Sequence, residues 1–303
     1  WQQPKTANGL DKLNKPEIKA DRQIVLIDNK HNVFPGISGA EWTNVILWKS
    51  NYNNKLEGLQ RIFTNGKDLK IKKIIWDQSE IEKPKELIIL YNCVKLFGDF
   101  QSIQKITSAR KPYGLAADVI NHYDKYNVEP MNYEKNNEED ICIYAKNKVK
   151  RYVCSDYKFP RISPRLDKYK IFVAKAWGNM SAGYIGGAYS DIIIAPPRSA
   201  CTETYLESGS FNDLDTAKKH AKYLMTRFVR GLFYLNKFSQ NSTRSWGAIP
   251  IQDYSEGFWN LSIEEIDDCL MKKYNVPIDV KEFVYKNIQK KSEQNIVNFE
   301  EMK

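Results

Sequence analysis

Short apolar runs bounded by polar turn residues characterise the first eighty residues of the chain. Residues 23–28 and 42–48 are rich in β-branched and aromatic side chains and end at Asp, Asn, Gly or Pro, which predicts two buried strands. Residues 33–36, Val-Phe-Pro-Gly, predict a turn between them, and residues 55–83 predict a further strand with a connector. Because so few strands do not make a stable unit by themselves, we expect them to close a larger α/β sheet.

Strand and helix patterns are mixed in the rest of the chain. Residues 84–97 hold an apolar run that favours a helix. Residues 141–157 and 169–174 alternate as strands, and 192–194 predict a short strand in the core. The Gly- and Ser-rich residues 178–189 predict a loop or hairpin.

The clearest helix is predicted at 213–238, where apolar residues recur at helical spacing. Either Asn212 or Asp213 is suited to cap its start. Its expected core face consists of Ala217, Ala221, Leu224, Phe228 and Leu232. Ser-x-x-Glu at 262–265 is the capping-box pattern of a second helix, and the charged tail from residue 280 predicts a helix that then frays.

The charge of the chain is unevenly distributed. Of its 303 residues 42% are hydrophobic, which is typical of a globular protein, and the net charge is +9. Residues 141–250 contain 18 Lys and Arg against 7 Asp and Glu, a net charge of +11, so the rest of the chain sums to −2. Such a basic block indicates nucleic acid or an anionic membrane surface as partner. A genome that favours Lys, Asn and Ile is the alternative, and it explains the Lys excess but not the Arg residues beside aromatics.

Several classes of protein are excluded by what the sequence lacks. It has no apolar run of about 18 residues, so we expect no membrane partner. Its five cysteines form no C-x-x-C pair and its three histidines do not cluster, which predicts reduced thiols, no metal site and a cytoplasmic location. The Glu-x-Lys at 17–19 has no upstream Asp to complete a nuclease site. Because the chain does not begin with Met, we expect it to begin inside a longer protein.

Five short motifs occur in one order along the chain. They are V-F-P-G at 33–36, S-A-R-K-P-Y-G-L at 108–115, A-P-P-R-S-A-C-T-E-T-Y at 195–205, K-Y-L-M-T-R-F at 222–228 and I-P-I-Q-D-Y at 249–254. In this order they resemble the C-terminal half of adenine-specific DNA methyltransferases of bacterial restriction–modification systems, the class with an N-P-P-Y catalytic motif. Residues 259–274 resemble the last motif of sequences in the same family.

The resemblance implies a fold class between α/β and α+β. Residues 1–80 would be the C-terminal part of the methyltransferase domain, the last strands of a Rossmann-like sheet. Residues 81–303 would be a mixed α+β target recognition domain with C-terminal helices. The implied function is sequence-specific binding of double-stranded DNA as the target-recognition part of the methyltransferase.

The chain departs from the family at both catalytic motifs. The F-x-G-x-G loop for S-adenosylmethionine is absent, and Ala195-Pro196-Pro197-Arg198 has the prolines of N-P-P-Y without its Asn or its aromatic. We therefore expect no methyl transfer by this chain alone, and S-adenosylmethionine bound outside it, in a missing N-terminal half or a catalytic subunit. Two alternatives stay open: a stand-alone specificity subunit or regulatory module acting in trans, and part of a fused nuclease–methyltransferase.

Arg110, Lys111 and Tyr113 are the first candidate DNA contacts. They flank Pro112 on a rigid turn, where two cations can bind phosphate and an aromatic ring can stack on a sugar or base. The alternative is a solvated turn with a half-buried Tyr113.

Two further candidates lie in the third motif. Arg198 follows a stiff Pro-Pro turn and is suited to a bidentate contact with guanine or phosphate, the alternative being an ion pair with Glu203 or Glu207. Thr202 begins a segment, 202–205, that we expect to be a strand. The resemblance implies that this segment faces the DNA.

The remaining candidates belong to the basic helix and the loop after it. One flank of the helix carries three cations that could contact DNA: Arg227, Arg230 and Lys237. The alternative is that this flank is only a solvated charged face. Arg244 and Trp246 lie in a loop rich in hydrogen-bond donors, and for Trp246 the alternative is a role as a lid on the core.

Overall fold

The computed structural model describes residues 84–175, 191–236 and 245–298, and the backbone of six strands elsewhere in the chain. The chain divides into two compact units, residues 1–83 and 84–303. The expected assignment of residues 1–80 to a methyltransferase domain and of 81–303 to a target recognition domain stays a prediction.

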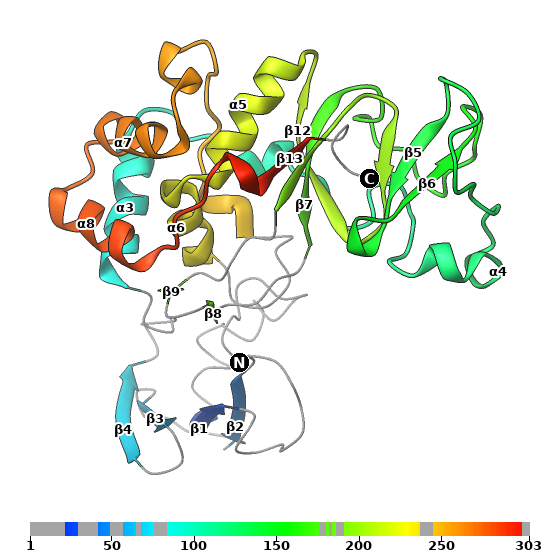
Figure 1. Cartoon of the computed structure of the whole chain (residues 1–303). Coiled ribbons are helices and arrows are strands. Elements are labelled where there is room, and N and C mark those ends of the chain that lie inside the picture. The colour runs from blue at the N-terminus through cyan, green and yellow to red at the C-terminus, as the bar shows by residue number, and fades with distance from the viewer. Residues whose placement is uncertain are drawn as a thin grey trace. The chain divides into compact units, whose positions relative to one another are not determined.

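The first unit contains a four-stranded mixed sheet in the order β2-β1-β3-β4 (Figure 1). Its strands are β1 (Arg22–Asn29), β2 (Trp42–Trp48), β3 (Glu57–Thr64) and β4 (Asp68–Ile75). β1 pairs antiparallel with β2 and parallel with β3, and β3 pairs antiparallel with β4. The first two strands confirm the prediction, whereas residues 55–83 hold two strands instead of one. The turn expected at 33–36 lies outside the described residues, and closure of a Rossmann-like sheet stays a prediction.

The second unit is built on two mixed sheets. The central sheet has the order β12-β7-β10-β13, and the smaller one has the order β11-β5-β6. The strands are β5 (Ile141–Tyr144), β6 (Lys150–Val153), β7 (Tyr169–Ala174), β10 (Ile192–Ala195), β11 (Ser199–Cys201), β12 (Tyr205–Phe211) and β13 (Ile296–Asn298). A short hairpin of β8 (Met180–Ser181) and β9 (Tyr184–Ile185) confirms the expected loop or hairpin at 178–189.

Six α-helices belong to the described part of this unit. They are α3 (Lys85–Leu96), α4 (Tyr123–Tyr126), α5 (Leu214–Met225), α6 (Arg227–Asn236), α7 (Ile263–Lys273) and α8 (Ile278–Asn287). Short 3-10 turns occur at Ile103–Ile106, Val119–Asn121, Lys146–Lys148, Ser245–Ala248, Gly257–Asn260 and Glu293–Asn295. Together with the sheets, these helices agree with the α+β class.

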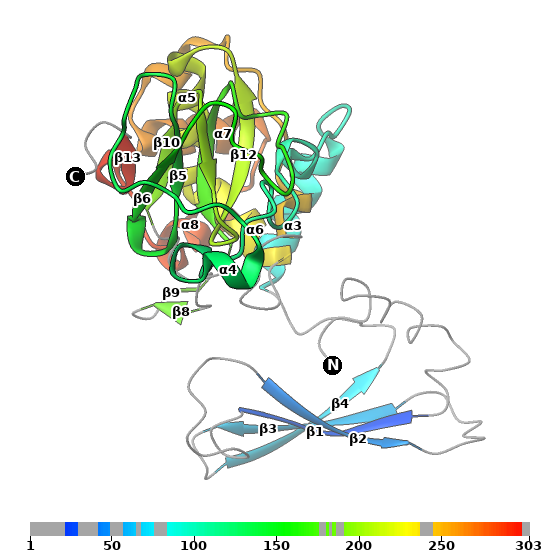
Figure 2. The same ribbon diagram turned by 90° about the vertical axis from the view of Figure 1, so that its right-hand side faces the viewer.

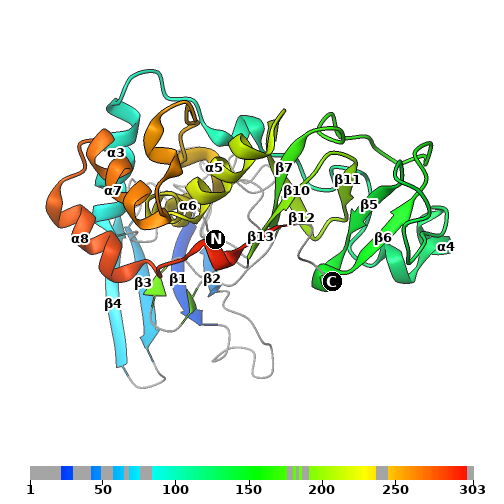
Figure 3. The ribbon, with the colours of Figure 1, turned by 45° about the horizontal axis from the view of Figure 1, so that its top comes forward.

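Both faces of the central sheet are buried, because its strands separate two hydrophobic cores. Ile171 and Val173 of β7 face the core shared with the helices, and Phe172 between them faces the core shared with the smaller sheet. β10 divides its side chains in the same way. A strand covered on both faces is a continuous apolar run, as in Ile-Ile-Ile at 192–194. Figure 3 shows the three layers side by side, and Figure 2 views them from the side of β5 and β6: α3 and α5–α8, then β7, β10 and β12, then β5 and β6 with α4.

The helix predicted at 213–238 is two helices. Asp213 caps α5, and its Oδ1 accepts a hydrogen bond from Thr216 N–H at 2.7 Å. Thr226 then adopts an extended backbone (ψ 150°), and its hydroxyl accepts from Val229 N–H at 3.2 Å. Asp267 accepts from the first two N–H groups of α6, each at 2.8 Å. The helix therefore restarts at Arg227 because a cap of its own and a distant carboxylate satisfy its N–H groups.

Two other expectations are corrected. Residues 202–204 are a turn between β11 and β12 instead of part of a strand. Residues 296–298 do not fray after α8, because they form β13, which lies beside β10 (Figure 3). The pairing is parallel, with Ile296 opposite Ile192. By contrast, the capping box at Ser262 and Glu265 and the full burial of the predicted core face of α5 and α6 are confirmed.

Neither a membrane-spanning helix nor a metal-binding group occurs among the described residues. None of the helices described is both long and apolar enough to cross a membrane. No group of three His, Cys, Asp or Glu residues in that part of the chain is arranged to hold a metal ion. All five cysteines are free thiols.

Candidate nucleic-acid interface

The turn at 110–114 is held firmly against the central sheet. Just before it, Ser108 N–H donates to the Glu207 carbonyl of β12 at 2.8 Å, and Glu207 N–H donates to the Ser108 hydroxyl at 2.9 Å. The turn closes with Gly114 N–H on the Lys111 carbonyl at 3.0 Å, and both residues have left-handed φ angles, 55° for Lys111 and 76° for Gly114. A Cβ on Gly114 would lie 2.7 Å from the Cβ of Pro160. Glycine is therefore required there both by conformation and by space.

Three cations converge on one carboxylate beside this turn. Arg110 donates from Nε to Glu203 Oε1 at 2.6 Å, and Lys111 Nζ lies 3.3 Å from Glu203 Oε2. Lys175, directly after β7, reaches Glu203 Oε1 at 2.5 Å. Glu203 belongs to the turn before β12, where its N–H donates to the Leu115 carbonyl at 2.8 Å. We call these four side chains the Glu203 cluster; its formal net charge is +2.

Two cations of the Glu203 cluster lie outside, Lys175 is 20% exposed, and the carboxylate lies inside. The side chains of Arg110 and Lys111 are 57% and 38% exposed, whereas that of Glu203 is 8% exposed. Burial raises the pKa of Glu203, but hydrogen bonds from Lys175 and Arg110 outweigh it and hold this pKa below its ordinary value. The carboxylate is therefore ionised at neutral pH, and the excess positive charge faces solvent.

More positive charge lies next to this turn. Arg161 is exposed, and its N–H donates to the Tyr113 carbonyl at 3.3 Å. Residues 141–170 carry nine Lys and Arg against two Asp. This excess is visible in the sequence, but Arg161 and Lys175 were not among the predicted contacts, and Glu203 was considered only as a partner of Arg198. The signal for Lys175 was its position directly after a buried strand, whereas no local pattern paired Glu203 with Arg110 or Lys111.

Tyr113 is not available for stacking on DNA, which corrects the expectation for this residue. Its side chain is fully buried, and its hydroxyl donates to Glu207 Oε1 at 2.7 Å and to the Ser199 carbonyl at 3.2 Å. The ring packs against Phe159 at 5.3 Å between centroids. Burial, followed by the charge of Glu207, raises the pKa of Tyr113 far above its usual range. Tyr113 therefore anchors the turn from beneath while Arg110 and Lys111 face outward.

Arg198 is accessible, but its guanidinium is already engaged. The residue has a left-handed φ of 57°, and Nε donates to the Glu139 carbonyl at 2.9 Å. Its Nη1 lies 3.6 Å from the Glu139 carboxylate. The ion-pair partner is thus neither Glu203 nor Glu207. Thr202 is fully buried and donates its N–H to the Tyr144 carbonyl at 2.8 Å, so a direct DNA contact by its side chain is not supported.

The two arginines of α6 serve packing among helices, which corrects the expectation of a basic flank. Arg230 is 4% exposed and donates to the Gln289 carbonyl after α8. The side chain of Arg227 is 12% exposed, and its guanidinium lies 4.7 Å from the ring centroid of Tyr285. Both cations are therefore turned toward α7 and α8.

Trp246 belongs to the core and not to a DNA-binding surface, in agreement with the alternative that it is a lid on the core. It is fully buried, and its ring meets Phe233 of α6 edge-on at 4.7 Å. Lys237 and Arg244 lie outside the described residues, and their proposed DNA contacts stay predictions. Of the ten candidates, the structure brings Arg110 and Lys111 together on one exposed surface.

Comparison with known proteins finds likeness at the level of structure alone. No protein-family model and no curated protein sequence matches the chain. Among solved structures, the chain is similar to one reported as the type IIG restriction endonuclease BpuSI, with 10% sequence identity and a TM-score of 0.36. The match covers 94% of this chain and 46% of that one, so the chain spans about half the length of the endonuclease.

Proposed function

We propose that residues 84–303 bind double-stranded DNA as the target-recognition part of an adenine-specific DNA methyltransferase of a restriction–modification system. The observation that carries the DNA-binding proposal is the Glu203 cluster, in which a buried carboxylate pairs with three cations, two of them exposed at the surface. The five ordered sequence motifs support the class of enzyme.

The cluster is suited to the phosphate backbone. Arg110 presents a planar set of donors that can bind a phosphate in a bidentate manner, and Lys111 and Lys175 add point charges. Glu203 limits the motion of all three, so less side-chain entropy is lost when a phosphate binds. Such contacts supply affinity without base preference. Arg198, on its stiff turn, is the candidate for a contact with a base, and that contact would require its guanidinium to leave Glu139.

Methyl transfer is assigned to a part of the enzyme outside this chain. The chain has neither the F-x-G-x-G loop nor the N-P-P-Y motif, so no step of the reaction is derived for its residues. In the complete enzyme S-adenosylmethionine would supply the methyl group for the adenine amino nitrogen, in the cytoplasm. The catalytic part belongs either to the same polypeptide or to a separate subunit.

The test is the salt dependence of DNA binding by the Arg110→Ala, Lys111→Ala double variant. A phosphate contact contributes a slope of about 0.9 in log K against log salt. We expect the variant to bind random duplex DNA more weakly at low salt and to lose up to about 1.8 from this slope. Fluorescence anisotropy with a labelled duplex at several salt concentrations measures both quantities.

A matched control removes the same charge elsewhere. Lys218 and Lys286 are exposed residues of α5 and α8, and the Lys218→Ala, Lys286→Ala double variant should keep nearly the full slope. Equal losses in the two double variants would mean that net charge alone attracts DNA. An unchanged slope in the Arg110, Lys111 variant would remove the cluster from the DNA contact.

A further inference from the structure

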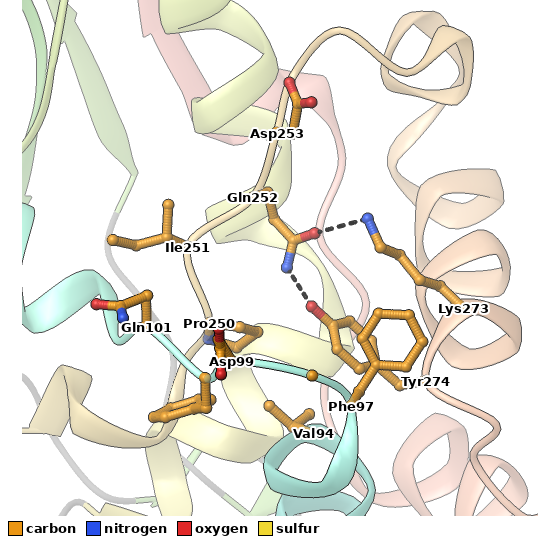
Figure 4. A pocket seen from close by; sticks show the side chains of 12 residues that line it. Val94, Phe97, Asp99, Gln101, Pro250, Ile251, Gln252, Asp253, Lys273 and Tyr274 are labelled. Atoms are coloured by element: carbon orange, nitrogen blue, oxygen red, sulfur yellow. Dashed lines mark hydrogen bonds between the residues drawn. The ribbon is translucent and has the colours of Figure 1, made fainter.

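A pocket of about 460 Å³ opens where the ends of α3 and α7 meet residues 250–253 (Figure 4). The Gln252 amide donates to the Tyr274 hydroxyl at 2.7 Å, and its oxygen accepts from Lys273 at 3.4 Å (Figure 4). Because these inner polar groups bind one another, they do not define the chemistry of a ligand. Residues 133–140, in the loop before β5, bear more directly on the proposed DNA contact.

This loop is acidic in a basic neighbourhood. Residues 133–140 contain four carboxylates and one lysine, a formal charge of −3, and residues 141–170 carry nine Lys and Arg against two Asp. Asn132, just before the loop, exchanges two backbone hydrogen bonds with Tyr152 of β6, each at 2.8 Å. Ile141, just after it, begins β5. Because both its ends are fixed to the smaller sheet, we call residues 133–140 the acidic strap.

Hydrogen bonds within the acidic strap give it a defined conformation. Asp140 is 6% exposed, and its Oδ2 accepts from the N–H groups of Asn136 at 2.8 Å and Asn137 at 3.1 Å. Asn137 in turn accepts through Oδ1 from Glu139 N–H at 3.0 Å. The strap is therefore a folded turn, and its contacts with neighbouring segments are specific.

One end of the acidic strap engages Arg198. The guanidinium donates from Nε to the Glu139 carbonyl at 2.9 Å and from Nη2 to the same carbonyl, and Nη1 lies 3.6 Å from Glu139 Oε2. The side chains are 32% and 74% exposed, so the pair lies at the surface. The planar set of donors that would bind a phosphate or a guanine is thus occupied by one residue of the strap.

The backbone beneath Arg198 is fixed from the inside. Lys170 is fully buried, and its Nζ donates to the carbonyls of Leu166 at 2.9 Å and Pro196 at 3.1 Å. Arg198 N–H donates to the same Leu166 carbonyl at 2.8 Å. Because the turn itself is held, DNA reaches the donors of this guanidinium when the strap moves or the side chain rotates away from it.

The other end of the acidic strap covers a second arginine. The guanidinium of Arg151, on β6, lies 4.0 Å from the ring centroid of Tyr133. Tyr133 is 77% exposed, so this cation–π contact lies at the surface. Two arginines from different segments of the chain therefore meet the two ends of one acidic loop.

We propose that the acidic strap is an autoinhibitory cover that competes with double-stranded DNA for Arg198 and Arg151. The Glu139 carboxylate takes the place of a phosphate on one guanidinium, and the Tyr133 ring takes the place of a base on the other. DNA must exchange these contacts for its own, and the charge of −3 on the strap repels it until it does. This inference rests on the proposed function, in which residues 84–303 bind DNA.

The first test removes the carboxylate that holds Arg198. Glu139→Gln is compared with Glu138→Gln, which removes the same charge from the adjacent exposed residue of the strap. Fluorescence anisotropy with a labelled random duplex at low salt measures the affinity. We expect Glu139→Gln to bind about two- to fivefold more tightly than Glu138→Gln, the range that an exposed ion pair provides.

A double-mutant cycle identifies the group that is released. Arg198→Ala should weaken DNA binding more in the Glu139→Gln chain than in the natural chain, because the released guanidinium binds a phosphate without first leaving a carboxylate. Thermal melts establish that each variant is folded. An equal cost of Arg198→Ala in the two chains would overturn the competition for this arginine.

A second pair of variants tests the cover on Arg151. Tyr133→Ala removes the ring and should strengthen binding of the random duplex about two- to fivefold, the range of an exposed cation–π contact. Tyr133→Phe keeps an aromatic face over the guanidinium and should retain the affinity of the natural chain. Equal affinities of these two variants would overturn the competition for Arg151.

The outcomes separate this inference from the proposed function. Equal affinities of Glu139→Gln and Glu138→Gln, together with a reduced salt slope in the Arg110→Ala, Lys111→Ala variant, would overturn the autoinhibitory cover and leave the DNA contact standing. Absence of duplex binding by all these chains at low salt would remove the DNA contact, and the competition with it.

Discussion

Glu203 and Glu207 lie four residues apart, and each holds the turn at 110–114 from a different side. Glu203 pairs at the surface with Arg110 and Lys111. Glu207 is fully buried, and its carboxylate accepts from the hydroxyls of Tyr113 at 2.7 Å and Ser163 at 2.5 Å. A buried carboxylate is stable only when its oxygens are paired. At the residue scale, therefore, one glutamate orients the cations and the other anchors the backbone that carries them.

A buried histidine makes stability depend on pH. His220 is fully buried, with Nδ1 2.6 Å from the Tyr254 hydroxyl and Nε2 2.9 Å from Ser208 Oγ. Burial lowers its pKa from 6.5 to about 3. Between these values the unfolded chain binds the proton and the folded chain does not, so acidification destabilises the fold. We expect this residue to cost about 1.4 kcal/mol per pH unit as the pH falls from 6.5 toward 3.

The measurement is the free energy of unfolding in urea from pH 7 to pH 4, for the natural chain and for His220→Asn. The difference between the two curves isolates the histidine, because other groups contribute to both. Asp267 is one such group. Burial raises its pKa to about 7, so over much of this range acidification stabilises the fold through Asp267, opposite to the effect of His220. Parallel curves would show that the imidazole titrates alike in the folded and unfolded chain.

At the scale of elements, α6 depends on a residue from another helix. Asp267 of α7 is 2% exposed and accepts from the N–H groups of Arg227 and Phe228, each at 2.8 Å. A carboxylate at a helix start also interacts favourably with the helix dipole. This contact fixes α6 against α7 at the point where the chain turns after α5.

Removal of that carboxylate should destabilise the helical layer. Asp267→Ala leaves two buried N–H groups without an acceptor, so we expect a loss of about 2–3 kcal/mol in the free energy of unfolding. Chemical denaturation at pH 8 measures it. Asp268→Ala, which alters an adjacent carboxylate with a side chain 53% exposed, is the control and should cost clearly less. Equal losses would argue against the capping role.

At the scale of the whole second unit, the C-terminal strand completes the central sheet. β13 pairs with β10, Asn295 donates to Asp191 at 3.1 Å, and Glu293 accepts from Ile263 N–H at 3.3 Å. The end of the chain is thereby tied both to the sheet and to α7. Its loss would expose one edge of β10, which is fully apolar.

Truncation tests this role of the C-terminal strand. Deletion of residues 292–303 removes the strand pairing and the burial of Ile296 and Val297, so we expect a loss of about 1–3 kcal/mol in the free energy of unfolding. Deletion of residues 299–303 alone is the matched control and should have little effect. Thermal melts of the two truncated chains provide the comparison, and identical melting temperatures would contradict the prediction.

The sequence alone determined features that depend on neighbours along the chain. The strands at 23–28, 42–48 and 169–174 follow from short apolar patterns, and the caps at Asp213 and Ser262 follow from hydrogen bonds within one helical turn. The break after α5 was not predictable in this way, because one of its two causes, Asp267, lies far along the chain.

Only the tertiary structure decided which charged and aromatic residues face solvent. Arg110 meets a carboxylate 93 residues away and stays exposed, whereas Arg230 meets a carbonyl 59 residues away and is buried. The sequence predicted both as DNA contacts, so sequence alone did not separate them. The excess of positive charge is a property of the sequence. Its presentation at the Glu203 cluster is a property of the fold, because side-chain depth is set by contacts between segments that only folding brings together.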